Sequence, residues 1–317
     1  MPLDQAGLDL CGAMVQTAAM LLWPYLALVA AGSCWGLGLP FGKVALAETD
    51  AAHMILLRFA VAAVAVLPLA LRKAASRRLF LSPAVLIAGV CYALGFLVQF
   101  EGLARANVAV AALLVGVMPA LIAVAAAIGG ERISWVSWLG VAGATLGAAL
   151  IAGKPGGQVA PLGIGLCLIS LPIFLGWLYA SRHAPKSAGS ADVSCVTIVI
   201  AAVVLLPIAW ILHGPPSLHL SPPAWGGIIG QGLLSTVVAT IAWQVGSPKV
   251  SSAAAGVFIN LEPLVGSAIG VTLFHDRPTL VAVLGGALIL GGSLVTVLSE
   301  HADRHEQLTP SDAATPA

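Results

Sequence analysis

Long apolar runs recur along the whole chain, and short polar breaks separate them. A helix that spans the hydrocarbon core of a bilayer needs about 20 apolar residues, and the runs have this length. They lack the period-two alternation of a membrane β-barrel, which is the other structure that can cross a bilayer. We therefore predict an all-α integral membrane protein with ten transmembrane helices, at residues 23–46, 51–71, 82–103, 108–129, 135–153, 161–182, 191–213, 225–247, 252–274 and 279–298.

The composition agrees with a membrane protein. Hydrophobic residues make up 59% of the 317 residues and charged residues only 9%, whereas soluble domains carry about 25% charged residues. Most of the surface must therefore face membrane lipids. The net charge of +1 offers no polycation for nucleic acid. Neither the five cysteines nor the seven histidines show metal-ligand spacing, so we expect no metal and no cofactor.

The short loops place most Lys and Arg residues on one side of the membrane. That side holds Arg72, Lys73, Arg77, Arg78, Arg132, Arg182, Lys186, Lys249 and Arg304, whereas the other side holds Arg105, Lys154 and Arg277. Because positively charged loops stay in the cytoplasm, we predict a plasma-membrane protein with both termini cytoplasmic. Residues 1–22 then form a cytoplasmic segment, and the polar residues 299–317 form a disordered cytoplasmic tail.

The second half of the chain repeats features of the first half. Each half has a proline inside its fourth helix and an acid–Arg pair in the next loop. The first half has Met118-Pro119 and then Glu131-Arg132, and the second has Glu262-Pro263 and then Asp276-Arg277. We therefore predict two five-helix repeats, at residues 23–153 and 161–298. Five is an odd number, so the second repeat must be inverted in the membrane. Inverted repeats are typical of secondary transporters, which bind substrate near the midplane.

Several short motifs occur in a fixed order across the two halves. They are Cys34-Trp35-Gly36 followed by Lys43, Leu57-Arg58-Phe59, Pro119, Gly130-Glu131-Arg132 followed by Gly140 and Gly147, and Leu261-Glu262-Pro263. In this order and spacing, residues 24–298 resemble the EamA-type transporters of the drug/metabolite transporter superfamily. One departure is the second acidic loop, where His275-Asp276-Arg277 replaces the usual Gly-Glu-Arg. The resemblance implies ten helices in an inverted repeat and the movement of small metabolites, often the export of amino acids.

Four ionisable residues lie inside the predicted helices. A charge at the bilayer centre costs about 2.5–3.5 kcal/mol on insertion scales, so such residues are functional candidates. Glu262 is the deepest, about ten residues into its helix, and we expect it either to couple transport to protons or cations, or to hold helices together. Lys43, Arg58 and Glu101 lie in the outer half. We expect Glu101 and Arg58 to form an ion pair, either as an outer gate or as a static contact.

Other polar and aromatic residues in the spans form a candidate substrate cavity: Trp35, Tyr92, Gln99, Trp177, Trp243, Gln244 and Asn260. Amide groups and aromatic walls suit a zwitterionic, amphiphilic metabolite, although each residue taken singly also suits helix packing. The acids of the two short loops, Glu131 and Asp276, are expected to be structural, since charges at an interface can hold a tight interhelical turn.

These features predict a secondary transporter that works by alternating access and exports small organic metabolites, such as amino acids or drugs, with protons as a candidate second substrate. The segment from Gly36 to Lys43 fails the GxxxxGK[ST] pattern of a phosphate loop, so ATP-driven transport by this chain has no support. Two alternatives stay open. A membrane enzyme would need a nucleophile–base pair or metal ligands, which the sequence does not display, and a sensor subunit would be expected to carry a soluble domain. We therefore assign no catalytic residue.

Overall fold

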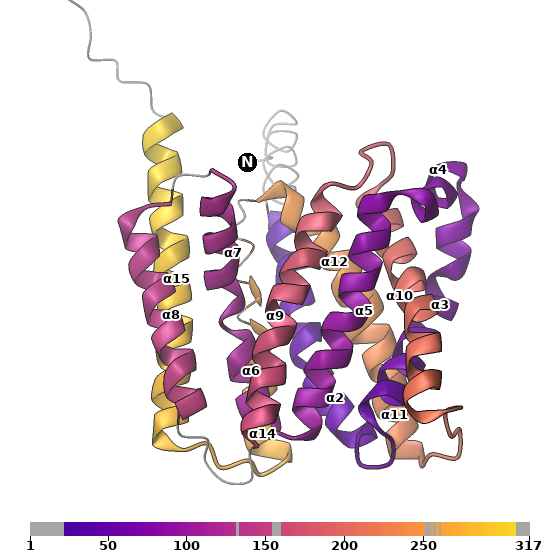
Figure 1. Cartoon of the computed structure of the whole chain (residues 1–317). Helices are drawn as coiled ribbons and strands as arrows, with labels where there is room; N and C mark the ends of the chain where they lie inside the picture. The colour runs from indigo at the N-terminus through magenta and orange to yellow at the C-terminus, as the bar shows by residue number, and fades with distance from the viewer. Residues whose placement is uncertain are drawn as a thin grey trace, which may run out of the picture.

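The computed structural model describes residues 22–130, 133–153, 160–250, 255, 258–259 and 261–308. Every element in these ranges is a helix, and the long helices run up and down in one bundle (Figure 1). Two apolar helical segments are shorter than a bilayer, Leu261–Leu273 and Val283–Gly292. Seven segments of the described chain are long and apolar enough to cross a membrane: Leu22–Ala45, Ala51–Arg72, Pro83–Ala104, Val108–Ala125, Pro161–Arg182, Ser190–His213 and Pro222–Lys249.

Short polar side chains begin several of the helices. Asp50, Asn107 and Ser221 each accept a hydrogen bond from the backbone N–H three residues later, which satisfies a free donor of the first turn. The α-helices are α2 (Gly38–Ala45), α3 (Ala51–Arg72), α4 (Ala74–Arg78), α5 (Pro83–Ala104), α6 (Val108–Val115), α7 (Met118–Ile128), α8 (Trp135–Gly153), α9 (Pro161–Arg182), α10 (Ser190–His213), α11 (Pro222–Gly230), α12 (Ala239–Gly246), α14 (Leu261–Leu273) and α15 (Leu280–Leu308). Between α11 and α12 lies a π-helix, η2 (Gln231–Val238), and single 3₁₀ turns are η1 (Leu79–Leu81) and η3 (Ser247–Lys249).

The helix predicted at residues 108–129 is divided in two. Its first part, α6, ends at Val115, and α7 begins at Met118. Pro119 therefore lies in the first turn of α7, where the missing N–H of proline leaves no helical acceptor unpaired. The break places the end of α6 and the start of α7 in the interior of the bundle, beside the cavity described below.

The last helix is longer than predicted. Residues 299–308 continue α15 to Leu308, so the disordered tail expected at 299–317 is wrong for its first ten residues; residues 309–317 lie outside the described chain. The physical reason is that this polar stretch contains good helix formers and has no proline before Pro310. High polarity by itself therefore did not indicate disorder here.

The helices pack mainly across the two halves of the chain. The contacting pairs are α3 with α10, α6 with α14, α8 with α15, α5 with α9 and α2 with α11, and Figure 1 shows α8 beside α15 at one edge of the bundle. A β-carbon built on Gly147 of α8 would lie 2.4 Å from the carbonyl oxygen of Gly285 of α15. Only glycine therefore permits this close approach of the two backbones.

Candidate functional site

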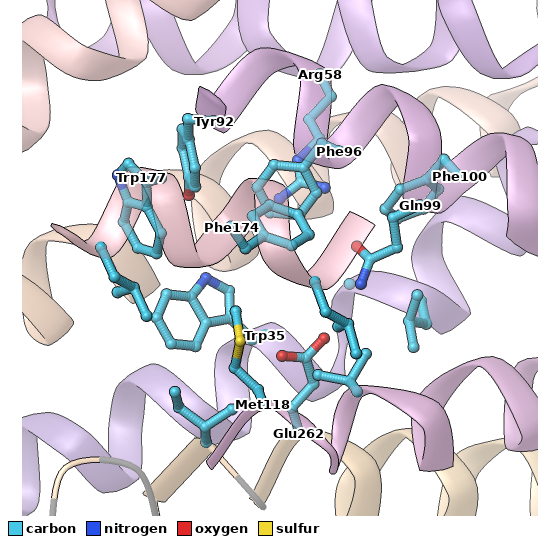
Figure 2. A pocket seen from close by; sticks show the side chains of 16 residues that line it. Trp35, Arg58, Tyr92, Phe96, Gln99, Phe100, Met118, Phe174, Trp177 and Glu262 are labelled. Carbon is cyan, nitrogen blue, oxygen red and sulfur yellow. The ribbon is translucent and has the colours of Figure 1, made fainter. Parts of the chain in front are cut away.

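A small cavity lies in the middle of the bundle, bordered by residues of α3, α5, α9, α14 and the first span (Figure 2). Its free volume is about 50 Å³, far below the ~300–1,000 Å³ of a typical ligand pocket. Side chains must therefore move before an organic metabolite can enter. The polar and aromatic residues of its lining are Trp35, Arg58, Tyr92, Phe96, Gln99, Phe100, Phe174, Trp177 and Glu262.

Arg58 is a fully buried cation at one side of this cavity. Its side chain has no exposed surface, and a buried charge needs polar partners to offset its lost hydration. Its Nε donates a hydrogen bond to the Thr236 hydroxyl at 2.6 Å, and its Nη2 donates to the Ser235 carbonyl at 3.3 Å. The guanidinium carbon also lies 3.9 Å from the centre of the Phe96 ring, a cation–π contact. Its Nη1 has no hydrogen-bond partner among the described residues.

The π-helix η2 connects Arg58 to the first span. Ser235 donates its hydroxyl proton to the Cys34 carbonyl at 2.6 Å, and the Gln231 amide donates to the Gly38 carbonyl. The Thr236 hydroxyl, which accepts from Arg58, itself donates to the Gln231 carbonyl at 3.0 Å. Local π-helical turns are frequent at functional sites, and here the turn brings two acceptors to one guanidinium.

Glu262 lies across the cavity from Arg58. It belongs to the first turn of α14, and its half-buried side chain borders the open space. Figure 2 shows its carboxylate on the opposite side of the cavity from the guanidinium, with aromatic rings between them. No salt bridge joins the two charges in the described chain. The cavity is therefore dipolar, with a cation at one side and a carboxylate at the other.

Aromatic rings form the walls. Tyr92 stacks on Trp177 with ring centres 4.6 Å apart, Trp177 meets Trp35 edge-on at 6.1 Å, and Phe96 meets Phe174 edge-on at 4.8 Å. The Tyr92 hydroxyl is hydrogen-bonded to the hydroxyl of Thr240. The buried Trp177 indole N–H has no acceptor among the described residues.

The structure gathers most of the predicted cavity residues and separates a few. Trp35, Tyr92, Gln99, Trp177 and Glu262 line one space, as does Arg58, which was expected in an outer gate. Trp243 packs against Trp35, with ring centres 5.3 Å apart, without lining the cavity. Gln244 lines a different pocket. Asn260 lies outside the described residues.

Three aromatic rings of the lining were not predicted from the sequence: Phe96, Phe100 and Phe174. Phe96 and Phe100 are one and two turns after Tyr92 on α5, and Phe174 is one turn before Trp177 on α9. Residues three or four apart share one face of a helix. This spacing was the available signal that these rings face the same space as their neighbours.

The ion pair expected between Glu101 and Arg58 is wrong for this structure. Glu101 instead accepts a hydrogen bond from Arg105, one turn later on α5, at 2.5 Å. Lys43 donates to the carbonyl oxygens of Leu103 and Ala106, at 3.1 and 2.8 Å, where the free carbonyls at the C-terminal end of α5 attract a cation. The expectation failed because sequence position indicates the depth of a residue in the membrane but not the direction in which its side chain points.

The acidic loop of the second half contacts a helix start. The Asp276 carboxylate accepts the backbone N–H of Ala109 in the first turn of α6, at 3.0 Å. An anion at a helix N-terminus is favourable because free N–H groups meet there. The contact agrees with the structural role expected for Asp276; its counterpart Glu131 lies outside the described residues.

Comparisons with known proteins find similarity to membrane transporters. The sequence model of the EamA-like transporter family matches residues 22–153 and again residues 161–298. A protein of Streptantibioticus cattleyicolor named "Probable terminal-alkyne amino-acid exporter" is 25% identical over 292 residues, which cover 90% of this chain and 96% of the relative.

Two shorter matches and one solved structure add to this. A "Probable biotin transporter" of Pseudomonas aeruginosa is 32% identical over 100 residues, 31% of this chain and 35% of the relative. The "Uncharacterized transporter YwfM" of Bacillus subtilis is 30% identical over 122 residues, 38% of this chain and 40% of the relative. A protein crystal structure aligns with a TM-score of 0.66 and 21% identity over 89% of this chain and 98% of the other, which shows a shared fold.

Proposed function

Because the chain belongs to the EamA-like transporter family, we propose that this multi-pass membrane transporter is a secondary exporter of small zwitterionic metabolites, such as amino acids. The observation that carries the proposal is the aromatic cavity with Arg58 on one side and Glu262 on the other. Arg58 is held by Thr236 and Ser235 before any solute arrives, so the carboxylate of a solute meets a preorganised donor.

An amino acid with an apolar side chain matches the three kinds of group in the cavity. Its carboxylate can accept from the free Nη1 of Arg58. Its ammonium group can bind the Glu262 carboxylate, and its side chain can pack against Trp35 and Phe174. The amino-acid exporter that matches almost the whole chain supports this class of solute.

Alternating access is supported by the way in which the halves pack. Counted as two sets of five, the second, fourth and fifth helices each contact their own counterpart: α3 with α10, α6 with α14 and α8 with α15. The first helix of one set contacts the third of the other in both directions, α2 with α11 and α9 with α5. A two-fold axis between two five-helix repeats produces this reciprocal pattern. With an odd number of helices per repeat, the axis lies in the membrane plane, giving ten helices as an inverted pair.

We assign the end of the bundle that carries α4 to the cytoplasm, in the plasma membrane. Arg77 and Arg78 of α4 lie at this end, and Arg182 and Lys186 follow at the C-terminal end of α9 (Figure 1). Clustered basic residues in short connections favour the cytoplasmic side. Both termini then lie in the cytoplasm.

We further propose that Glu262 couples export to protons. It is a carboxylate that borders the cavity and can bind either a proton or the ammonium group of the solute, but not both. Binding of one species therefore releases the other, which is the requirement for proton exchange.

The test is flux of apolar amino acids into proteoliposomes with and without a pH gradient, for wild type, Glu262→Gln and Glu101→Gln. Glu101 is the matched control, because its carboxylate is paired with Arg105 and does not line the cavity. We expect Glu262→Gln to abolish the stimulation by the gradient and Glu101→Gln to keep it. Equal stimulation in Glu262→Gln and wild type would exclude the coupling role, and no flux in wild type would exclude this substrate class.

A further inference from the structure

A second pocket opens near the end of the bundle that carries α4. It lies between the C-terminal end of α9, the start of α10 and the end of α12, and its free volume is about 510 Å³. That volume falls within the range of ~300–1,000 Å³ typical of ligand pockets. Unlike the central cavity, it has room for an organic group.

Two buried polar groups at the floor of this pocket lack partners. The Gln244 amide nitrogen and the Ser181 hydroxyl have no hydrogen-bond partner among the described residues, and both residues line the pocket and are 8% exposed. Leaving a buried polar group unpaired costs about 1–3 kcal/mol. An amide nitrogen can only donate a hydrogen bond, so the group that satisfies Gln244 must be an acceptor.

The rim of the pocket is basic. Arg182 and Lys186 line it and are exposed to solvent, and none of the lining residues within the described ranges is acidic. The nearby Asp192, on α10, is already paired with Lys73, with its carboxylate 3.0 Å from the ammonium nitrogen. Donors on the floor and cations on the rim both favour a negatively charged ligand.

The pocket adjoins the aromatic wall of the central cavity. Ser181 is one turn beyond Trp177 on α9, and Gln244 follows Trp243, which packs on Trp35. An anion held here is therefore separated from the central cavity by the tryptophan rings.

From these contacts we propose that the pocket is an anion site distinct from the central cavity, in which Gln244 and Ser181 donate hydrogen bonds and Lys186 supplies charge. The ligand chemistry is a carboxylate or phosphate group. It can come from a soluble solute that waits before entry, a form that rests on the proposed export function, or from the headgroup of an anionic lipid, a form that does not.

The experiment uses the full chain, purified in a neutral detergent at constant sodium chloride concentration. The midpoint of thermal unfolding is followed during titration with acetate, with uncharged acetamide as the matched control. A parallel titration compares phosphatidylglycerol with phosphatidylcholine. The variants are Gln244→Leu, Lys186→Gln and, as a control for charge alone, Arg78→Gln, which removes a cation of α4 that is not among the residues lining the pocket.

We expect wild type to be stabilised by acetate more than by acetamide, by phosphatidylglycerol more than by phosphatidylcholine, or by both, which identifies the source of the anion. Gln244→Leu should raise the half-saturating concentration by about tenfold or more, the change expected for one lost hydrogen bond to a charged group. Lys186→Gln, at an exposed position, should weaken binding without disturbing the fold, and Arg78→Gln should match wild type.

Two results would overturn the anion site: equal response to the charged and uncharged member of each pair, or unchanged half-saturation in both Gln244→Leu and Lys186→Gln. Neither result bears on amino-acid flux into proteoliposomes, which is measured separately. Failure of this site and failure of the proposed export function are therefore distinguishable.

Discussion

The hydroxyl of Thr236 is the closest partner of the buried Arg58 guanidinium. It accepts the Arg58 Nε–H at 2.6 Å, and both side chains have no exposed surface. Substitution Thr236→Val keeps the shape of the side chain but removes the acceptor. The Nε–H would then be buried without a partner, since water does not reach it.

The geometry of this hydrogen bond sets the expected loss in the free energy of unfolding. A hydrogen bond to a charged group contributes about 1.5–3 kcal/mol, so Thr236→Val should lower the free energy of unfolding by about that amount. The matched control is Thr272→Val, because Thr272 is exposed on α14 and donates only to the Ala268 carbonyl. A surface change of this kind is expected to stay within about 0.5 kcal/mol.

The assay is unfolding of the detergent-solubilised chain by sodium dodecyl sulfate, followed by tryptophan fluorescence. Three of the eight tryptophans, Trp35, Trp177 and Trp243, lie close to the site, so part of the signal reports on this region. If Thr236→Val unfolded at the same denaturant fraction as Thr272→Val, the claim that Thr236 holds the Arg58 cation would be refuted.

Two further predictions concern packing and pH. Gly147→Ala should destabilise the chain by about 1–3 kcal/mol. Gly143→Ala on the same helix should be neutral, because the new β-carbon would lie an ordinary 3.7 Å from its nearest neighbouring atom. The same unfolding assay compares the two variants, and equal losses of unfolding free energy would contradict the close approach of α8 and α15. Partial burial acts to raise the pKa of Asp50, but the His53 backbone N–H and the imidazoles of His53 and His213 outweigh it and lower that pKa. The stabilisation by Asp50 is therefore present above the ordinary Asp pKa of about 3.9 and lost as pH falls through the lower folded value. Asp50→Asn should lower the thermal midpoint at pH 7 but not near pH 2, and a pH-independent difference would contradict this.

The sequence predicted the helical membrane character well because long apolar runs have few alternatives in a membrane. The helical, membrane-spanning character is confirmed, and so is the resemblance to EamA-type transporters. The observed helices differ from the predicted ones where the local backbone conformation is decisive. The differences are the break between α6 and α7 before Pro119, the π-helix η2, and the extension of α15. No apolar pattern distinguishes a π-helical turn from an α-helical one.

The candidate site was only partly predictable. Glu262 was identified because a charged group inside a membrane span is costly and is therefore a functional candidate. The aromatic residues were identified because large rings are typical of the walls of a ligand pocket. Arg58 was found but given the wrong partner, since contacts between α3 and η2 join residues 177 and 178 positions apart in the sequence. Such a contact requires the packing of two helices from different halves, which the pattern of a single helix does not contain.

The central claim is that the solute crosses through the cavity between Arg58 and Glu262. The most direct measurement loads proteoliposomes with a mixture of amino acids and identifies by mass spectrometry which of them leave, for wild type, Arg58→Gln and Arg105→Gln. Arg105 is the matched control, because it is exposed and its side chain pairs with Glu101 at the end of α5. The account predicts that wild type and Arg105→Gln release apolar amino acids and that folded Arg58→Gln retains them. Release by Arg58→Gln at the wild-type rate would contradict it.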